Sequence, residues 1–313
     1  MTDAVELVVT PKSRDIGDFT VRRSLPTARR RAVGPFIFLD EMGPTAFAAG
    51  AGLDVRPHPH IGLATVTYLF EGEILHRDSL GTVQPVRPGD VNWMTAGRGI
   101  VHSERSPEPL RQAAHRLHGI QAWVGLPRDL ETTDPAFDHT PWRELPVIRG
   151  DGFEAVVVAG AACGAASPVP VASPTLYLDV TMRPGGGLEL PADDGERAVY
   201  VVSGQLRVGD GVVEAGTLAV LSSGIELRLE AVSTTRAMVL GGEPLDGRRH
   251  MRWNLVGSDR GRVDRAAADW NASINAGFRG TRFTLPPDEH EHVPLPDTLV
   301  SGPPTADSEC PTS

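Results

Sequence analysis

The chain has 313 residues, a net charge of −10 and two cysteines, Cys163 and Cys310. The acidic balance argues against direct binding to nucleic acid or to anionic membranes, because both require a basic surface. So few cysteines exclude a disulfide framework and a cysteine-based zinc site. The N-terminal residues are charged, and no apolar run reaches the roughly 18 residues that a membrane span needs. We therefore expect a cytoplasmic protein outside any membrane, and we take it to be a monomer.

Length and composition favour an all-β protein with two domains. A chain of this size suits two units of about 100–150 residues each. The 34 glycines and 27 prolines suit short strands joined by tight turns. After a basic lead-in, a strand is expected at residues 36–40. Between residues 55 and 124, β-rich runs alternate with turn pairs such as Glu71-Gly72 and Pro88-Gly89, a spacing typical of a sandwich or barrel.

The second half of the sequence echoes the first. Three echoes occur in the same order: YLFEGEIL at 68–75 with YVVSGQLR at 200–207, PGDV at 88–91 with AGTL at 215–218, and TAG at 95–97 with SSG at 222–224. The offset between the copies is about 130 residues, a period that indicates duplication of a whole domain. We therefore expect two copies of one barrel.

The residues that carry chemistry form two pairs. His58 and His60 lie in the sequence RPHPH, and His102 and Glu104 follow in GIVHSE. The i, i+2 spacing places both side chains of a pair on the same face of a strand. Two neighbouring strands that each turn one pair inward would bring three imidazoles and one carboxylate to one point. This donor set suits Fe(II), Mn, Ni, Cu or Zn, and it predicts one divalent transition metal in the first domain.

The second copy lacks such residues. Carried across the repeat, the four ligand positions fall on Leu190, Ala192, Leu229 and Ala231. The chain has no histidine between His139 and His250. We therefore expect the second domain to be metal-free and to serve as a packing partner or a binding scaffold.

The remaining histidines have weaker claims. His76 either hydrogen-bonds near the metal or is a structural residue. His115 and His118 are expected to be structural. The pair His290 and His292 repeats the ligand spacing but lies in a Pro-rich, acidic stretch without a predicted scaffold. We expect neither residue of that pair to be a ligand.

The predicted domains are residues 1–160 for the metal-binding barrel, 161–285 for the second barrel with a C-terminal arm and helix, and 286–313 for a disordered tail. A stretch of small residues and prolines supports the first boundary, and the Pro-rich acidic composition supports the last. Ser258 is expected to cap a helix that runs to about Trp270. In this helix Val263, Ala266, Ala267 and Trp270 share one face.

Several of these segments together resemble the pirin family of bicupins. The resemblance rests on RPHPH at 56–60, TVTY at 65–68, EG at 71–72, HRDS at 76–79, PGDV at 88–91 and, most specifically, WMTAGRGIVHSE at 93–104. It continues weakly through GIQAW at 119–123 and GGEPL at 241–245, and covers roughly residues 10 to 285. It implies two antiparallel cupin-type β-barrels (double-stranded β-helices) face to face. It also implies one iron, as Fe(II), on His58, His60, His102 and Glu104.

The resemblance implies two kinds of function. Some pirins act as quercetin 2,3-dioxygenases, which open a flavonol ring with O₂. Others bind proteins, as a transcription cofactor in animals or as a modulator of metabolic enzymes in bacteria. We expect dioxygenase chemistry on a flavonol-like phenolic substrate, with Glu104 as both metal ligand and nearest base. The alternative is a non-catalytic, iron-dependent regulator that binds a partner protein. A third hypothesis is a metal-stabilised scaffold without a redox role.

One position departs from the family pattern. Many pirins have a glutamate four residues after the second histidine of HPH, where this chain has Ala64. On a regular strand, position 64 would share the inward face of His60, although Gly62 could introduce a bulge that breaks this parity. We expect the missing carboxylate to leave flavonol activity weak at neutral pH.

Overall fold

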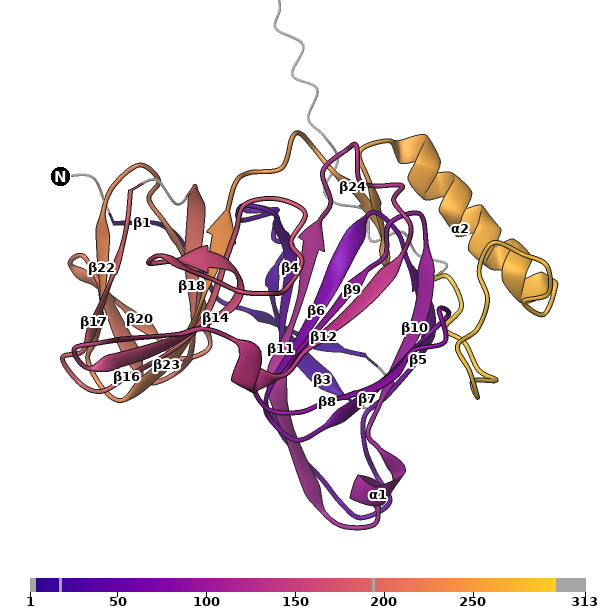
Figure 1. Ribbon diagram of the computed structural model, residues 1–313, viewed down its shortest axis with the longest axis horizontal. Coiled ribbons are helices and arrows are strands. Elements are labelled where there is room, and N and C mark those ends of the chain that lie inside the picture. The colour runs from indigo at the N-terminus through magenta and orange to yellow at the C-terminus, as the bar shows by residue number, and fades with distance from the viewer. Residues whose placement is uncertain (1–3, 17–18, 193–194, 297–313) are drawn as a thin grey trace, which may run out of the picture.

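A computed structural model describes residues 4–16, 19–192 and 195–296, and these residues form two β-sandwiches that lie side by side (Figure 1). The large sheet of the first sandwich runs β12 (Ala136–Thr140), β9 (Val91–Thr95), β6 (Leu63–Glu71), β11 (His115–Gly125), β4 (Phe36–Phe47), β3 (Thr20–Leu25) and β2 (Lys12–Asp15). Its small sheet runs β5 (Asp54–His60), β10 (Ile100–Arg105), β7 (Ile74–Asp78) and β8 (Val83–Val86).

The second sandwich repeats this arrangement. Its large sheet runs β1 (Val5–Val9), β21 (Thr217–Leu221), β18 (Glu196–Ser203), β23 (Thr235–Gly242), β16 (Thr175–Met182), β14 (Phe153–Ala162) and β13 (Val147–Gly150), with β15 (Ala165–Ala166) on β14. Its small sheet runs β17 (Gly187–Leu190), β22 (Leu227–Ala231), β19 (Gln205–Val208) and β20 (Gly211–Glu214). The expected all-β architecture with two cupin-type units is confirmed.

The strand register identifies equivalent residues in the two copies. Tyr68 faces Ile120 across β6 and β11, and Tyr200 faces Met238 across β18 and β23. In the small sheet of the first sandwich His102 faces His58, and at the corresponding place in the second sandwich Leu229 faces Leu188. The counterparts of His58 and His60 are therefore Leu188 and Leu190, two residues earlier than the sequence offset indicates.

Strand pairing does not follow a division at residue 160. The N-terminal strand β1 pairs with β21 of the second sandwich, and β13 and β14 belong to the same sheet. From β1 onward the chain thus contributes a strand to the second sandwich, then forms the first sandwich, and enters the second sandwich again at Val147. Pairing with β1 covers the edge of β21, which would otherwise expose unpaired backbone groups.

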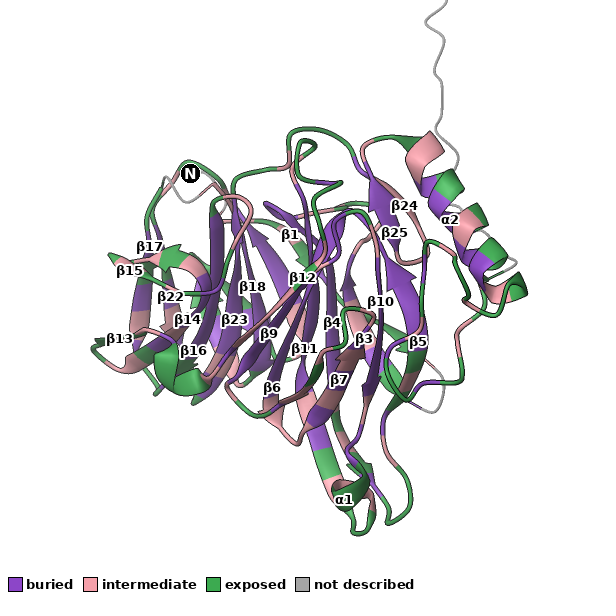
Figure 2. Ribbon diagram, turned by 45° about the vertical axis from the view of Figure 1, so that its right-hand side comes forward, coloured by how far each residue is buried: buried purple, intermediate pink, exposed green. Residues whose placement is uncertain are grey.

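The two large sheets pack against each other through a shared apolar core. Figure 2 shows that the strands on both sides of this junction are buried. From β6, Ala64, Val66 and Tyr68 point into this core, whereas Thr67 points into the first sandwich and contacts Glu104. Alternation along the strand explains the division. Inside the second sandwich the small sheet contributes only apolar side chains at the positions equivalent to the predicted ligands.

A C-terminal arm covers the outer face of the first small sheet. It comprises the hairpin of β24 (His250–Arg252) and β25 (Leu255–Gly257), helix α2 (Arg260–Asn275) and the residues that follow. Two short helices, α1 (Glu108–Arg111) and a 3₁₀ turn (Trp142–Glu144), lie in connections. Figure 1 shows α2 beside β5 and β10, on the side away from the second sandwich.

The apolar face of α2 is buried as predicted. It packs with Phe283 against Ile61 and Val101. The cap differs by one residue, because the side chain of Asp259 accepts the Gly261 N–H, while Ser258 donates to Glu131. None of the helices in the described residues combines the length and apolarity that crossing a membrane needs.

The expected disordered tail is only partly within the described residues. Residues 297–313 lie outside them. Residues 286–296 lie against the first sandwich, where Glu289 is 8 % exposed and Val293 N–H donates to Pro57 O at 2.8 Å. Composition alone suggested disorder, but buried charge pairs and a backbone hydrogen bond hold this part in place.

Candidate metal centre

Two neighbouring strands of the small sheet supply the predicted ligands. On β5 and β10, His58, His60, His102 and Glu104 turn toward the interior of the first sandwich. His102 faces His58 directly, and the pairing shifts register between His102 and Glu104. On its other side β10 pairs with β7, where Glu104 faces His76. The i, i+2 spacing therefore acts as the sequence predicted, on adjacent strands of one sheet.

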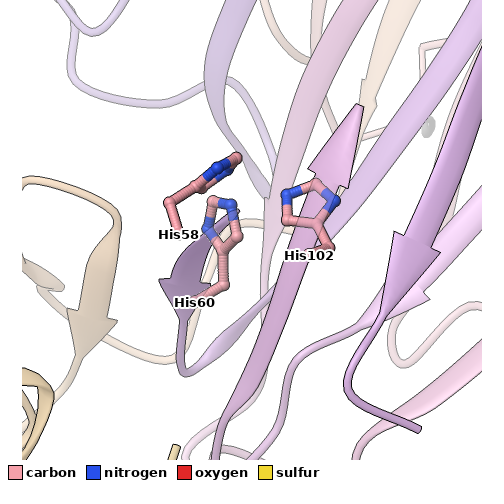
Figure 3. Close-up of side chains that lie close together, drawn as sticks. All are labelled: His58, His60 and His102. Carbon is pink, nitrogen blue, oxygen red and sulfur yellow. The ribbon is translucent and has the colours of Figure 1, made fainter. Parts of the chain in front are cut away.

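The three histidine rings lie together (Figure 3). One ring nitrogen from each of His58, His60 and His102 lies within 4.8 Å of the others. A second group shares His102 and adds His76 and Glu104, again with all ligand atoms within 4.8 Å. All five side chains are buried. The sequence-predicted ligands and the additional candidate His76 thus form one continuous cluster.

His58 is held in a defined tautomer. Its Nδ1 lies 2.8 Å from the carbonyl oxygen of Arg56. A carbonyl only accepts, so Nδ1 carries the proton and donates it. In the neutral ring the Nε2 lone pair is then free for a metal, as second-shell hydrogen bonds commonly arrange.

A relay of side chains orients His102. Nε2 of His76 lies 3.1 Å from Asp78 Oδ2, and Nδ1 of His76 lies 3.4 Å from Nδ1 of His102. The carboxylate can only accept from His76, so a neutral His76 presents an acceptor to the Nδ1–H of His102. Asp78 is fixed in turn, because its Oδ1 accepts from the backbone N–H groups of Leu80 and Thr82. This leaves the Nε2 lone pair of His102 uncommitted.

The carboxylate of Glu104 is also positioned by a neighbour. Its Oε1 accepts a 2.9 Å hydrogen bond from the hydroxyl of Thr67 on β6. Burial raises the pKa of Glu104, opposed by the nearby His76 and by the Thr67 hydrogen bond. Burial also acts on the pKa of Asp78, but hydrogen bonds from His76 and Thr82 lower it overall.

Burial keeps the three clustered histidines neutral. It lowers the pKa of His58 to about 4, against the opposing effect of the Arg56 carbonyl. Burial and the neighbouring His58 lower the pKa of His60 and His102 well below the usual range. Neutral imidazole is the form that binds a metal, so the side chains need not release protons for this purpose near pH 7.

The cluster fits a divalent transition metal. Nδ1 of His60 and Nε2 of His102 are buried and have no hydrogen-bond partner among the described residues. Such atoms are costly to bury unless something binds them. Three imidazoles and one carboxylate suit Fe, Mn, Ni, Cu or Zn. The His/Glu cluster could therefore hold one metal ion.

Aromatic side chains that the sequence analysis missed flank the cluster. The ring of Trp123 lies edge-on to His60, with centroids 5.1 Å apart, and stacks on Phe38 at 3.9 Å. The ring of Phe137 stacks on His76 at 4.4 Å. No spacing rule links these residues to the histidines, because they come from strands of the opposite sheet. Asp78 was detectable, since it follows His76 at the same i, i+2 spacing.

Ala64 does not share the ligands' face, contrary to the expectation for a regular strand. The chain passes from the small sheet to the large sheet at Gly62, which has φ +68°. A Cβ at this glycine would lie 2.2 Å from the carbonyl oxygen of Val256, so the turn requires glycine. Parity is lost there, and Ala64 packs in the core between the sandwiches.

The other histidines lie outside the cluster. His115 stacks on Phe47, and His118 hydrogen-bonds Glu41. His292 contacts the rings of Trp270 and Phe278 beside α2, and His290 is exposed. In the part of the chain that the structure describes, neither His290 nor His292 joins a group with metal-ligand spacing.

Two fused β-sandwiches of one topology, with a buried His/Glu cluster that lies, among the described residues, in the first sandwich only, define a bicupin with one candidate metal centre. Comparison with known proteins agrees. The family model for pirin matches residues 18–124, and the model for the pirin C-terminal cupin domain matches residues 177–276. The chain belongs to the pirin family.

Three similar proteins cover most of the chain. It is 47 % identical to a pirin-like protein of Caulobacter vibrioides, over 94 % of this chain and all of the relative. It is 40 % identical to a putative quercetin 2,3-dioxygenase of Pseudomonas aeruginosa, over 89 % of each. The crystal structure of quercetin 2,3-dioxygenase from Acinetobacter baumannii superposes with a TM-score of 0.83 at 34 % identity, covering 94 % of this chain and 96 % of that one.

Proposed function

We propose that this pirin binds one Fe(II) through His58, His60, His102 and Glu104 and catalyses quercetin 2,3-dioxygenase-type, O₂-dependent opening of a flavonol-like phenolic substrate. The observation that carries the proposal is the buried cluster itself. Ring nitrogens of His60 and His102 have no hydrogen-bond partner among the described residues, and the ring of Trp123 lies beside His60. The names of the Pseudomonas and Acinetobacter relatives support the same reaction class. A cytoplasmic location belongs to this proposal.

The protein side chains would perform three tasks. Thr67 keeps one oxygen of Glu104 occupied, so the other can accept the proton of a phenolic hydroxyl. Trp123 and Phe137 offer ring faces and edges to a planar aromatic substrate and exclude water. His76 and Asp78 keep His102 in one orientation. When bound, a divalent metal supplies Lewis acidity for the phenolic oxygen and redox chemistry for O₂.

One feature favours the alternative, an iron-dependent regulator that binds a partner protein. Asp78 is engaged by His76 and two backbone N–H groups, and Thr67 occupies one oxygen of Glu104. If the other oxygen of Glu104 binds the metal, neither carboxylate beside the histidines keeps an oxygen that can take a proton. A site without an uncommitted base is poorly equipped for proton abstraction and would still bind iron. In that case affinity for the partner should differ between the Fe(II) and Fe(III) forms.

Metal analysis joined to a flavonol assay tests the proposal. The purified protein should contain one metal per chain and should consume O₂ steadily with a flavonol. His102→Ala should lose most of the metal and the activity. The matched control is His115→Ala, at a histidine outside the cluster, and it should retain both. One metal per chain without O₂ consumption would favour the regulator, and two metals per chain would contradict the single site.

A further inference from the structure

Residues 286–296, here called the C-terminal strap, cross the outer face of the small sheet behind the metal cluster. The strap touches both ligand-bearing strands. Val293 N–H donates to the carbonyl oxygen of Pro57 on β5, next to His58. Glu289 binds Ser103 on β10, which lies between His102 and Glu104. The strap therefore holds both strands at residues adjacent to the predicted ligands.

Glu289 is the main contact of the strap with β10. Its Oε1 accepts from the Ser103 hydroxyl at 2.7 Å and from Arg105 Nε at 2.9 Å, and its Oε2 accepts from Arg105 at 2.7 Å. The side chain is 5 % exposed. Burial acts to raise the pKa of Glu289, but hydrogen bonds from Arg105 and Ser103 lower it overall. The carboxylate is thus a charged group whose hydrogen bonds all go to the ligand strand.

The contact lies where the small sheet is irregular. The register between β5 and β10 shifts between His102 and Glu104, so three steps on β5 oppose two steps on β10. At such a bulge the regular ladder hydrogen bonds are interrupted and the strand can bend. Ser103 on β10 and Pro57 on β5 are both within this irregular stretch. The strap forms a hydrogen bond with each of these two residues. These bonds hold the strands where the regular hydrogen bonds between β5 and β10 are interrupted.

We propose that Glu289 is a positioning residue for the metal centre. Ser103 and Arg105 point outward and alternate with the inward-pointing His102 and Glu104, so a carboxylate that holds the two outward side chains sets the relative position of the two inward ones. Support of this kind, one step behind the ligands, governs how well a metal site is preorganised. The inference rests on the proposed metal ligands.

The test compares two glutamates of the strap. Glu289→Ala removes the bonds to Ser103 and Arg105. Glu291→Ala is the matched control, because Glu291 also pairs with Arg105, at 3.1 Å, but is 59 % exposed and has no bond to Ser103. Co(II) is the probe. Its affinity is measured by chelator competition, its ligand field by the visible spectrum, and the stability of the metal-free protein by urea unfolding.

Glu289→Ala should weaken Co(II) binding by roughly tenfold, as expected when outer support of a metal ligand is lost, and should change the Co(II) spectrum. Glu291→Ala should match the wild type in both. If Glu289→Ala does not fold, Glu289→Gln keeps the shape and the Ser103 hydrogen bond while losing the charge. It should then show a smaller weakening in the same direction.

Wild-type affinity and spectrum in the Glu289 variants would overturn the proposal, even if urea unfolding occurred at lower concentration, because the contact would then be structural only. His102→Ala separates this failure from a failure of the metal site. If His102→Ala binds Co(II) as the wild type does, the predicted ligands are wrong. If His102→Ala loses Co(II) while Glu289→Ala retains it unchanged, the ligands stand and the positioning role is refuted.

Discussion

The hydroxyl of Tyr68 in the first sandwich donates a 2.9 Å hydrogen bond to Asp179 in the second. The reciprocal bond exists at the equivalent positions of the repeat, where Tyr200 of the second sandwich donates to Glu41 of the first. Each acid also binds a base on its own sandwich, Arg236 for Asp179 and His118 for Glu41. The pair Tyr68 and Tyr200 is the same pair that the sequence echo aligns. The duplication thus forms its own interface through a two-fold set of tyrosine–carboxylate bonds.

Variants that remove these bonds should lose different amounts of stability, depending on which partner is removed. Tyr68→Phe deletes one hydroxyl, while Asp179 keeps its bonds to Arg236, so the free energy of unfolding should fall by about 1 kcal/mol. Asp179→Ala leaves the buried Tyr68 hydroxyl without its acceptor and Arg236 without its carboxylate. The loss should then reach about 2–3 kcal/mol, because unsatisfied buried groups cost more than a missing bond contributes. Urea unfolding measures both.

The control for this prediction is Asp151→Ala. Asp151 pairs with Arg183 on the surface, where the two side chains are 98 % and 72 % exposed. An exposed pair adds little, so this variant should unfold like the wild type. Equal losses in Tyr68→Phe and Asp179→Ala would show that the hydroxyl, rather than the network, carries the interaction.

The packing of the N-terminal strand β1 against the second sandwich gives a second prediction about stability. Val8 and Val9 are adjacent on β1, yet Val8 is 54 % exposed and Val9 is 7 % exposed in the core between the sandwiches. Val9→Lys should destabilise the protein by more than about 2 kcal/mol, because it buries an unpaired charge. Val8→Lys should be neutral. A neutral Val9→Lys would mean that β1 does not hold the position against β21 that strand pairing indicates.

The neutral histidines predict a pH dependence for the metal-free protein. An unfolded histidine has a pKa near 6.5, whereas burial lowers the pKa of His58 to about 4 in the folded chain. Between these values the unfolded chain binds more protons, so stability is complete above pH 6.5 and is lost as the pH falls toward 4. From pH 7 to pH 5 the contribution of His58 alone should cost roughly 2 kcal/mol.

Urea unfolding of the metal-free protein at several pH values measures this slope. In His58→Asn the site no longer titrates, and the loss of stability between pH 7 and pH 5 should be smaller than in the wild type. An identical slope in wild type and variant would contradict the low pKa of His58. Bound metal should make the acid sensitivity steeper, because protonation then competes with the metal for the same lone pairs.

Much of the site was predictable because strand geometry is periodic. The i, i+2 pairs at His58 and His102 fixed which side chains share a face, and the second copy could be excluded because apolar residues occupy its ligand positions. The helix face ending at Trp270 followed from a 3.6-residue period. Local patterns of this kind carry their own geometry.

What escaped prediction depends on contacts distant in sequence. Thr67 and Trp123 reach the cluster from the opposite sheet, and Glu289 joins β10 from 186 positions away. Which face Ala64 occupies depended on whether the chain continues straight through Gly62 or turns there. It turns, and the carbonyl of Val256 lies too close to Gly62 for any side chain. Tertiary packing decided each of these cases.

The position of Ala64 leads to the last prediction. A glutamate here was expected to supply a base beside the metal, but the side chain points into the core between the sandwiches and is fully buried. Ala64→Glu should therefore not raise flavonol turnover at neutral pH. It should instead place a carboxylate among apolar residues of both large sheets and destabilise the protein by several kcal/mol, since no partner compensates its burial. Urea unfolding and turnover per bound metal are the measurements.

Ala161→Glu is the matched control, because Ala161 is exposed on β14 and the same substitution there should leave unfolding and turnover unchanged. Both variants add one carboxylate to a strand of a large sheet, at the buried Ala64 of β6 and at the exposed Ala161 of β14, so a difference between them separates the effect of burial from that of the added charge. A stable Ala64→Glu protein with faster turnover at neutral pH would show that position 64 reaches the metal cluster after all. Because Tyr68 and Val66 follow Ala64 on the same face of β6 and contact the second sandwich, that outcome would require β6 to turn over or the two sandwiches to separate.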